Sequence, residues 1–177
     1  MNDLSTIDAY GVVTEPATLT IQRLLPGPIE RVWSYLTDSD LRKQWLASGV
    51  MGANAGSTFE FVWRNAELTD PPGNRPEGFP EEHRLACEIT EIEPPHKLAF
   101  TWGRSGGVSI ALEQAGSKVL LTLIHKRLAD RESMLNVSAG WHAHLDLLVA
   151  RMAGRALSPF WDTWLSLKGE YARRIQA

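Results

Sequence analysis

The chain has 177 residues, of which 44% are hydrophobic and 22% are charged, and its formal net charge is −3. This length fits one domain with a core large enough to be stable without disulfides or metals. The slightly negative charge, without a long run of Lys or Arg, argues against a nucleic-acid-binding protein. The single cysteine, Cys87, excludes an internal disulfide and a cysteine-rich metal site. It lies in an alternating, strand-like run, which predicts a buried and inert thiol.

The N-terminus offers no targeting or membrane signal. Residues 1–16 contain early acidic residues and lack the basic-then-apolar layout of a secretion signal. No apolar run approaches the roughly 18 residues needed to cross a bilayer. The sequence therefore predicts a cytoplasmic protein without membrane insertion, built as an N-terminal arm (1–16) followed by a single domain (17–177).

The domain is predicted to begin with one strand and two short helices. Polar and apolar residues alternate over 17–25, and the Pro-Gly-Pro run that follows stops the strand. Apolar residues at helical spacing predict a short helix that starts at Pro28. A second short helix is expected over 40–46, with Asp38 or Ser39 as its cap.

A strand-rich middle section follows. Residues 58–64 alternate, so that Phe59, Phe61 and Trp63 share one face. Residues 67–82 contain four prolines and two glycines, and we expect them to form a flap over one end of the sheet. Four more strands with short connections, hence antiparallel neighbours, are predicted over 84–92, 97–102, 108–113 and 118–127. Strands that are segregated from helices in this way indicate the α+β class.

The last third of the chain is predicted to be helical. An amphipathic helix bounded by glycines is expected over 140–154, after a polar stretch (130–138). Its buried stripe consists of Trp141, Leu145, Leu148 and Met152. His144 lies at the shoulder of this stripe, whereas His142 is expected on the exposed side. The Ser158-Pro159 pair predicts a C-terminal helical extension over about 158–175.

Several segments resemble the family of activators of heat-shock protein 90 ATPase, within the START-like superfamily of polyketide cyclases and lipid-transport proteins. The resemblance covers roughly residues 17–155 in the order of the family. It rests on EITEIEPPHKLAFTW (88–102), SKVLLTLIH (117–125), Pro28-Ile29 with Val32-Trp33 and Trp45, and Gly140-Trp141 with Asp146, Leu148 and Gly154. It implies a helix-grip fold, in which a curved antiparallel sheet wraps a long C-terminal helix, two small helices close one mouth, and a cavity lies between sheet and helix.

The candidate ligand-binding residues are the aromatic and apolar side chains expected to face this cavity. They are Phe61, Trp63, Phe100, Trp102, Trp141, His144, Leu145, Leu148 and Met152. A filled core would use the same residues, and this alternative stays open. Catalytic residues, a metal site and cofactors are not predicted, because the common motifs are absent and His142 and His144 diverge by about 200° on a helix.

Five polar residues allow more than one interpretation. His144 is suited to hydrogen-bond or protonate a ligand carbonyl, or it is a histidine satisfied by neighbours. Arg151 is a candidate to bind a ligand carboxylate, or its guanidinium group extends into solvent. His125 points inward or marks where its strand leaves the core. Arg64 and Glu60 are expected to pair with each other outside the pocket or at its rim.

Three functions compete at this point. The first is a non-catalytic domain that binds a small hydrophobic or amphipathic ligand. The second is a protein-interaction module, either a homodimer or a chaperone-linked regulator in the stress response. The third is a cyclase-like enzyme that uses His144 as an acid or base, and it rests on analogy within the superfamily. The aromatic residues and the lack of a catalytic motif favour the first.

Overall fold

One curved antiparallel sheet forms the body of the computed structural model, which describes residues 7–104 and 106–175. Within these residues its seven strands follow the order β1-β2-β7-β6-β5-β4-β3, and neighbouring strands are antiparallel. The strands are β1 (Val12–Glu15), β2 (Thr18–Pro26), β3 (Thr58–Trp63), β4 (His83–Glu93), β5 (Lys97–Trp102), β6 (Gly106–Ala115) and β7 (Lys118–Lys126).

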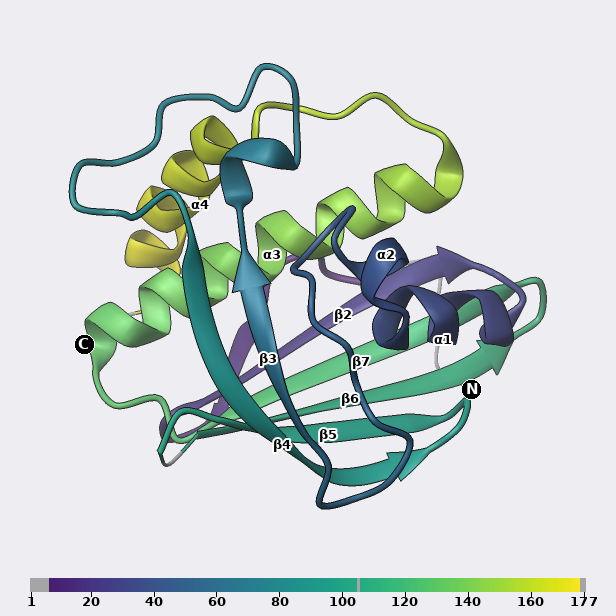
Figure 1. Cartoon of the computed structure of the whole chain (residues 1–177). Coiled ribbons are helices and arrows are strands. Elements are labelled where there is room, and N and C mark those ends of the chain that lie inside the picture. Colours follow the sequence, from purple (N-terminus) through teal and green to yellow (C-terminus); the bar gives the residue numbers. More distant parts are fainter. Residues whose placement is uncertain (1–6, 105, 176–177) are drawn as a thin grey trace.

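The helices lie on the concave side of this sheet (Figure 1). They are α1 (Ile29–Thr37), α2 (Ser39–Arg42), α3 (Arg131–Ala153) and α4 (Phe160–Arg174), and a short 3-10 helix, η2 (Asn65–Glu67), follows β3. Figure 1 shows α3 crossing the sheet, with α4 over the N-terminal half of α3 and with α1 and α2 near its C-terminal half. The α+β, helix-grip arrangement predicted from the sequence is confirmed.

The strand alternation seen in the sequence matches the buried faces of the sheet. β7 buries Val119, Leu121, Leu123 and His125 on one side, and β3 buries the three aromatic residues predicted to share a face. The thiol of Cys87 on β4 is 4% exposed. Burial raises its pKa to about 11, so it is the inert thiol that was expected.

The second short helix is shorter than predicted. α2 ends at Arg42, and residues 43–45 continue as turns. The expected cap is confirmed, because the Asp38 carboxylate accepts hydrogen bonds from the backbone N–H groups of Asp40 (2.9 Å) and Leu41 (3.1 Å).

The long helix begins earlier than predicted. α3 starts at Arg131 rather than at Gly140, because Asp130 caps it by accepting a hydrogen bond from the N–H of Ser133 at 2.7 Å. The polar stretch was therefore the first part of the helix. Gly140 lies inside α3, where a Cβ atom would be 3.9 Å from the indole nitrogen of Trp164. The C-terminal end is confirmed, since Gly154 takes the left-handed conformation (φ 67°) that ends a helix.

Part of the N-terminal arm belongs to the sheet. Val12–Glu15 form the edge strand β1 and pair with β2, with Val12 opposite Thr20. Residues 1–6 of the predicted arm lie outside the described residues. All four residues of β1 are exposed, so the burial pattern that identified the other strands is missing here.

The prediction that His142 is exposed is wrong. This side chain is 4% exposed because α4 covers that face of α3. Its Nδ1 atom is 2.9 Å from the hydroxyl of Tyr171, which also accepts a hydrogen bond from the N–H of Gly11 at 2.7 Å. Its Nε2 atom lies 3.4 Å from Asp146, which also bonds Arg23 at 3.0 Å. We call these groups the α3–α4 polar network: it joins the N-terminal arm, the sheet and both long helices.

The network holds its carboxylate in the charged form. Burial alone would raise the pKa of Asp146, but the hydrogen bond from His142 and the positive charge of Arg23 hold that pKa below its usual value. Burial is also the largest influence on Tyr171 and raises its pKa to about 12. The tyrosine therefore stays a neutral hydroxyl at physiological pH.

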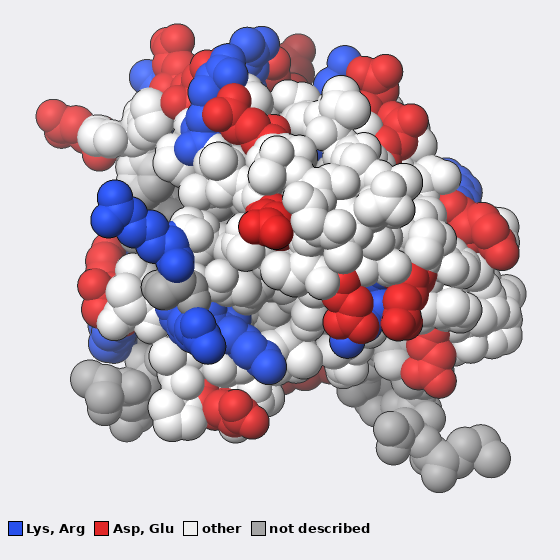
Figure 2. Space-filling model, turned by 60° about the horizontal axis from the view of Figure 1, so that its bottom comes forward, with Lys and Arg blue, Asp and Glu red and all other residues white. Residues whose placement is uncertain are grey.

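The side of the sheet that faces away from α3 is mostly uncharged. Figure 2 brings this side forward and shows acidic and basic side chains interspersed around a broad white area. Among the described helices, none combines the length and the apolar character that crossing a membrane requires.

Candidate ligand-binding pocket

A pocket of about 410 Å³ lies between the N-terminal half of α3, the helix α4, the ends of β3–β5 and the loop 68–82. This volume falls within the range of small-molecule sites, about 300–1,000 Å³. The lining residues are Leu46, Trp63, Asn65, Gly78, Phe79, Pro80, Glu81, His83, Trp102, Asn136, Val137, Gly140, Trp141, His144, Phe160, Trp161 and Trp164.

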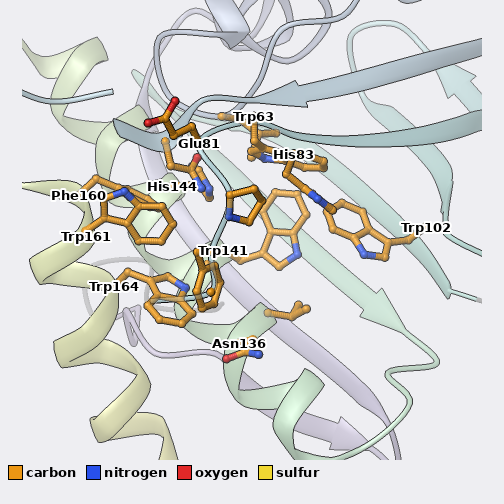
Figure 3. Close-up of a pocket in the computed structure, with 17 residues that line it drawn as sticks. Trp63, Glu81, His83, Trp102, Asn136, Trp141, His144, Phe160, Trp161 and Trp164 are labelled. Carbon is orange, nitrogen blue, oxygen red and sulfur yellow. The ribbon is translucent and has the colours of Figure 1, made fainter. Parts of the chain in front are cut away.

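Two aromatic walls face each other across the pocket. The sheet-side wall consists of Trp63, Trp102 and Trp141, with ring centroids 5.5 Å and 5.7 Å apart in that order. The α4-side wall consists of Phe160, Trp161 and Trp164, with successive separations of 5.1 Å and 6.0 Å. Figure 3 shows Phe160, Trp161 and Trp164 on one side of the pocket, and Trp63, His83 and Trp102 on the other. Five of the seven tryptophans of the chain line this space.

The loop predicted to act as a flap closes part of the pocket. It forms no helix or strand over 68–82, as expected from its prolines, and it is attached to the start of α4. The N–H of Phe160 donates to the hydroxyl of Thr69 at 3.0 Å, and the N–H of Trp161 donates to the carbonyl of Pro72 at 3.0 Å. The loop thereby places the Phe79 ring 5.7 Å from that of Trp161 and 5.1 Å from that of Trp164.

Four of the nine predicted site residues line the pocket, namely Trp63, Trp102, Trp141 and His144. The other five, Phe61, Phe100, Leu145, Leu148 and Met152, are buried in the core and do not line it. The spacing of apolar residues along a strand or helix identifies the face that turns inward. It does not distinguish residues that line a cavity from residues that are packed in the core.

The α4-side wall was missed by the sequence analysis. On α4, the side chains of Phe160, Trp164, Leu167 and Tyr171 are all buried. The segment that packs against this face was not evident, because the sequence does not show how α4 is positioned along α3. An aromatic residue within the proline-rich flap, Phe79, was the remaining signal for this wall.

The imidazole of His144 has a defined hydrogen bond. Its Nδ1 atom is 2.8 Å from the backbone carbonyl oxygen of Trp45, and its ring packs 4.8 Å from that of Phe160. Burial lowers the pKa of His144 to about 4, although the hydrogen bond to Trp45 offsets part of this effect. His144 is therefore neutral at pH 7 and cannot protonate a ligand carbonyl there.

His125 points inward, which was one of its two interpretations, and it lies behind the sheet-side wall. It is fully buried, and its Nδ1 atom accepts a hydrogen bond from the indole N–H of Trp141 at 3.0 Å. Its ring also packs 4.9 Å from that of Trp102. Burial lowers its pKa to about 4. This neutral histidine fixes the orientation of the central tryptophan of the wall.

The charged groups near the pocket are at its rim or are bonded elsewhere. The lining residues include no Lys or Arg, and the carboxylate of Glu81 is 87% exposed. Arg151, a candidate for a ligand carboxylate, instead donates to the backbone carbonyls of Gln44 and Leu68 at 3.2 Å and 3.0 Å.

The expected pair of Arg64 with Glu60 is wrong. Arg64 bonds Glu82 at 2.8 Å, and Arg84 bonds Glu60 at 2.9 Å. The antiparallel register of β3 and β4, which the sequence did not provide, brings Arg84 opposite Val62 and so beside Glu60. Among the described residues, no cluster of His, Cys, Asp and Glu is arranged to hold a metal ion.

A curved sheet around a long helix, with an aromatic pocket between them, defines a helix-grip domain of the START-like type. The family model described as "Activator of Hsp90 ATPase homolog 1-like protein" matches residues 26–153. The chain therefore belongs to this family, which confirms the resemblance seen in the sequence.

Solved structures show the same fold. A Bordetella parapertussis protein solved by NMR is 38% identical, with a TM-score of 0.79, and the match covers 100% of this chain and 97% of that one. CalU16 from Micromonospora echinospora is 21% identical (TM-score 0.67; 90% and 89% covered). The Aha1 dimer from Colwellia psychrerythraea is 17% identical (TM-score 0.58; 76% and 95% covered). A comparison with curated proteins gives no match.

Proposed function

We propose that this protein binds a small, largely apolar aromatic molecule in the pocket under α4 and does so without chemical conversion. The observation that carries the proposal is the pair of aromatic walls on either side of a 410 Å³ space. Ligand sites are typically apolar with a few polar groups that fix orientation. Here three lining residues each have a buried polar atom without a hydrogen-bond partner among the described residues: Asn65 Oδ1, Asn136 Oδ1 and Trp161 Nε1.

A fluorescent apolar probe tests this proposal. We expect N-phenyl-1-naphthylamine to bind with enhanced emission, and we expect Gly140→Leu to weaken its affinity at least tenfold. The added side chain would extend beside Trp164 into the pocket. Gly169→Leu is the matched control, because this glycine is on α4, is exposed, and has no atom within 4 Å of the added Cβ.

The result can contradict the proposal in two ways. If the probe does not bind, and mass spectrometry of the purified protein detects no bound small molecule, the pocket is not a ligand site. If Gly140→Leu folds normally and binds the probe like the native protein, binding occurs elsewhere.

A second candidate function is protein interaction through an edge of the sheet. One similar structure is that of an Aha1 dimer, and the edge strand β1 exposes Val12 (54%) and Val13 (38%). Exposed edge strands readily pair with other chains. Light scattering with native protein and with Val13→Lys tests this function, and an assay of Hsp90 ATPase stimulation tests a chaperone-linked role. A monomer without stimulation would exclude both.

Cyclase-like chemistry has weaker support. An acid–base catalyst works best when its pKa lies near the working pH. The pKa of His144 is lowered to about 4 by burial, which leaves it a weak base at neutral pH. We therefore propose binding rather than catalysis.

A further inference from the structure

The backbone around His144 determines which of its nitrogens carries the proton. The carbonyl oxygen of Trp45, 2.8 Å from Nδ1, can only accept a hydrogen bond. Nδ1 must therefore be the protonated nitrogen, and a neutral imidazole then has a lone pair on Nε2. Trp45 is itself fully buried, and its indole N–H donates to the carbonyl of Tyr35 at 2.9 Å. The acceptor that orients His144 is thus held in place by the core.

The second nitrogen of His144 remains available to a ligand. The hydrogen bonds found among the described residues engage Nδ1 and leave Nε2 without a donor. The side chain is 6% exposed and lines the pocket. Phe160 covers one face of the ring, but the lone pair of Nε2 lies in the ring plane and is not covered by this contact. Nε2 is not one of the fully buried polar atoms without a partner, so it faces the open space of the pocket, where a ligand donor can reach it.

Other polar atoms beside the pocket are also without a hydrogen-bond partner among the described residues. The side-chain oxygens of Asn65 and Asn136 are acceptors without partners in the described part of the chain, whereas Trp161 Nε1 is a donor. Within the described part of the chain, no Lys or Arg lines the pocket to attract an anion. Because an Asn amide carries donors as well as an acceptor, these groups suit a neutral polar ligand, and His144 alone sets the preference for a donor.

We infer that His144 is a specificity-determining residue that selects a neutral aromatic ligand carrying a hydroxyl or N–H donor. The donor bonds Nε2 of His144, while the aromatic ring lies between the sheet-side and α4-side walls. This inference rests on the proposed function. Aromatic molecules whose donor is replaced by a methyl group lose the hydrogen bond and leave Nε2 unsatisfied.

Matched pairs of small probes test the inference by isothermal titration calorimetry at pH 7. The pairs are 2-naphthol with 2-methoxynaphthalene, and indole with N-methylindole. We expect the donor-bearing member of each pair to bind about fivefold more tightly, the factor that corresponds to one net hydrogen bond.

Two variants separate the hydrogen bond from the shape of the pocket. His144→Asn keeps an amide donor for the carbonyl of Trp45 but has no acceptor at the place of Nε2, so the preference for donors should disappear. Trp164→Phe reduces a wall and should weaken both members of each pair by the same factor. If the preference persists in His144→Asn, another group selects the ligand.

A measurement on the native protein needs no variant. In protein with ¹⁵N-labelled histidine, 2-naphthol should shift the Nε2 resonance of His144 to lower frequency, and its methyl ether should not. Equal affinities within both pairs, or no difference in this shift, would overturn the inference and leave the proposed function intact. If none of the four probes binds, the proposed function fails with it.

Discussion

The two halves of α3 pack in different ways, although they belong to one continuous helix. In the N-terminal half, Asn136, Gly140 and His144 border the pocket below α4. In the C-terminal half, Leu145, Leu148 and Met152 are buried in the core. Gly140 has no side chain and so leaves open space beside α3, whereas the leucines of the other half fill the space around them. The difference shows how one helix can both stabilise the fold and border a binding site.

Acidification should have the largest effect, and it acts on the two buried histidines beside the pocket. Both His125 and His144 have pKa values of about 4 in the folded protein, lowered by burial from 6.5. As the pH falls below about 6.5, the unfolded chain binds protons that the folded chain does not. Stability is therefore full above pH 6.5 and is lost progressively down to pH 4, by about 3 kcal/mol for each histidine.

Urea denaturation between pH 7.5 and 4 measures this loss. His83→Gln, a change at an exposed histidine on the pocket rim, is the control for the effect of a histidine substitution itself. A stability that stays constant down to pH 4.5 would show that the two buried histidines are not held neutral.

Truncation of the packed half should have the next largest effect. Leu148 is fully buried, so Leu148→Ala should lower the free energy of unfolding by about 2–5 kcal/mol. The affinity for the aromatic probe should change less than twofold, because this residue does not line the pocket.

Val137→Ala is the matched truncation in the pocket half. This side chain is half-buried and lines the pocket, so we expect a loss of about 1 kcal/mol or less. Denaturation and probe titration of both variants measure the contrast. Equal losses of stability would mean that the two halves do not differ in packing.

Loss of the α3–α4 polar network should have a smaller effect than acidification or the truncation of Leu148. His142→Phe removes the imidazole that contacts both Tyr171 and Asp146. We expect the free energy of unfolding to fall by about 1–3 kcal/mol. The same change made together with Tyr171→Phe should cost less than the sum of the single changes, because the residues share a network. Thermal unfolding of the three variants measures this coupling, and strict additivity would contradict it.

Most elements could be predicted from sequence because their signals are local. The alternation in β7 and the caps at Asp38 and Gly154 depend on neighbouring residues alone, whereas Ser158 was expected to cap α4 and the N-cap is Pro159. The edge strand β1 was not found because its exposed residues carry no burial pattern. The start of α3 was missed because the cap at Asp130 was hidden in a polar stretch that resembled a loop.

The candidate site was only half predictable. Trp63, Trp102, Trp141 and His144 were identified by their position on inward faces, and they do line the pocket. The other wall depends on how α4 and the flap dock on α3, through hydrogen bonds such as Phe160 to Thr69 across a long stretch of sequence. The burial of His142 depends on the same docking.

The sequence by itself determined the family, the order of the strands along the chain and the faces that turn inward, since these follow from short-range patterns of polarity and turn residues. The tertiary structure decided where the interior stays open, because a cavity exists only where walls from distant segments fail to fill the space between them. It also decided the chemistry of His144. The carbonyl of Trp45 fixes its proton, and burial keeps it neutral.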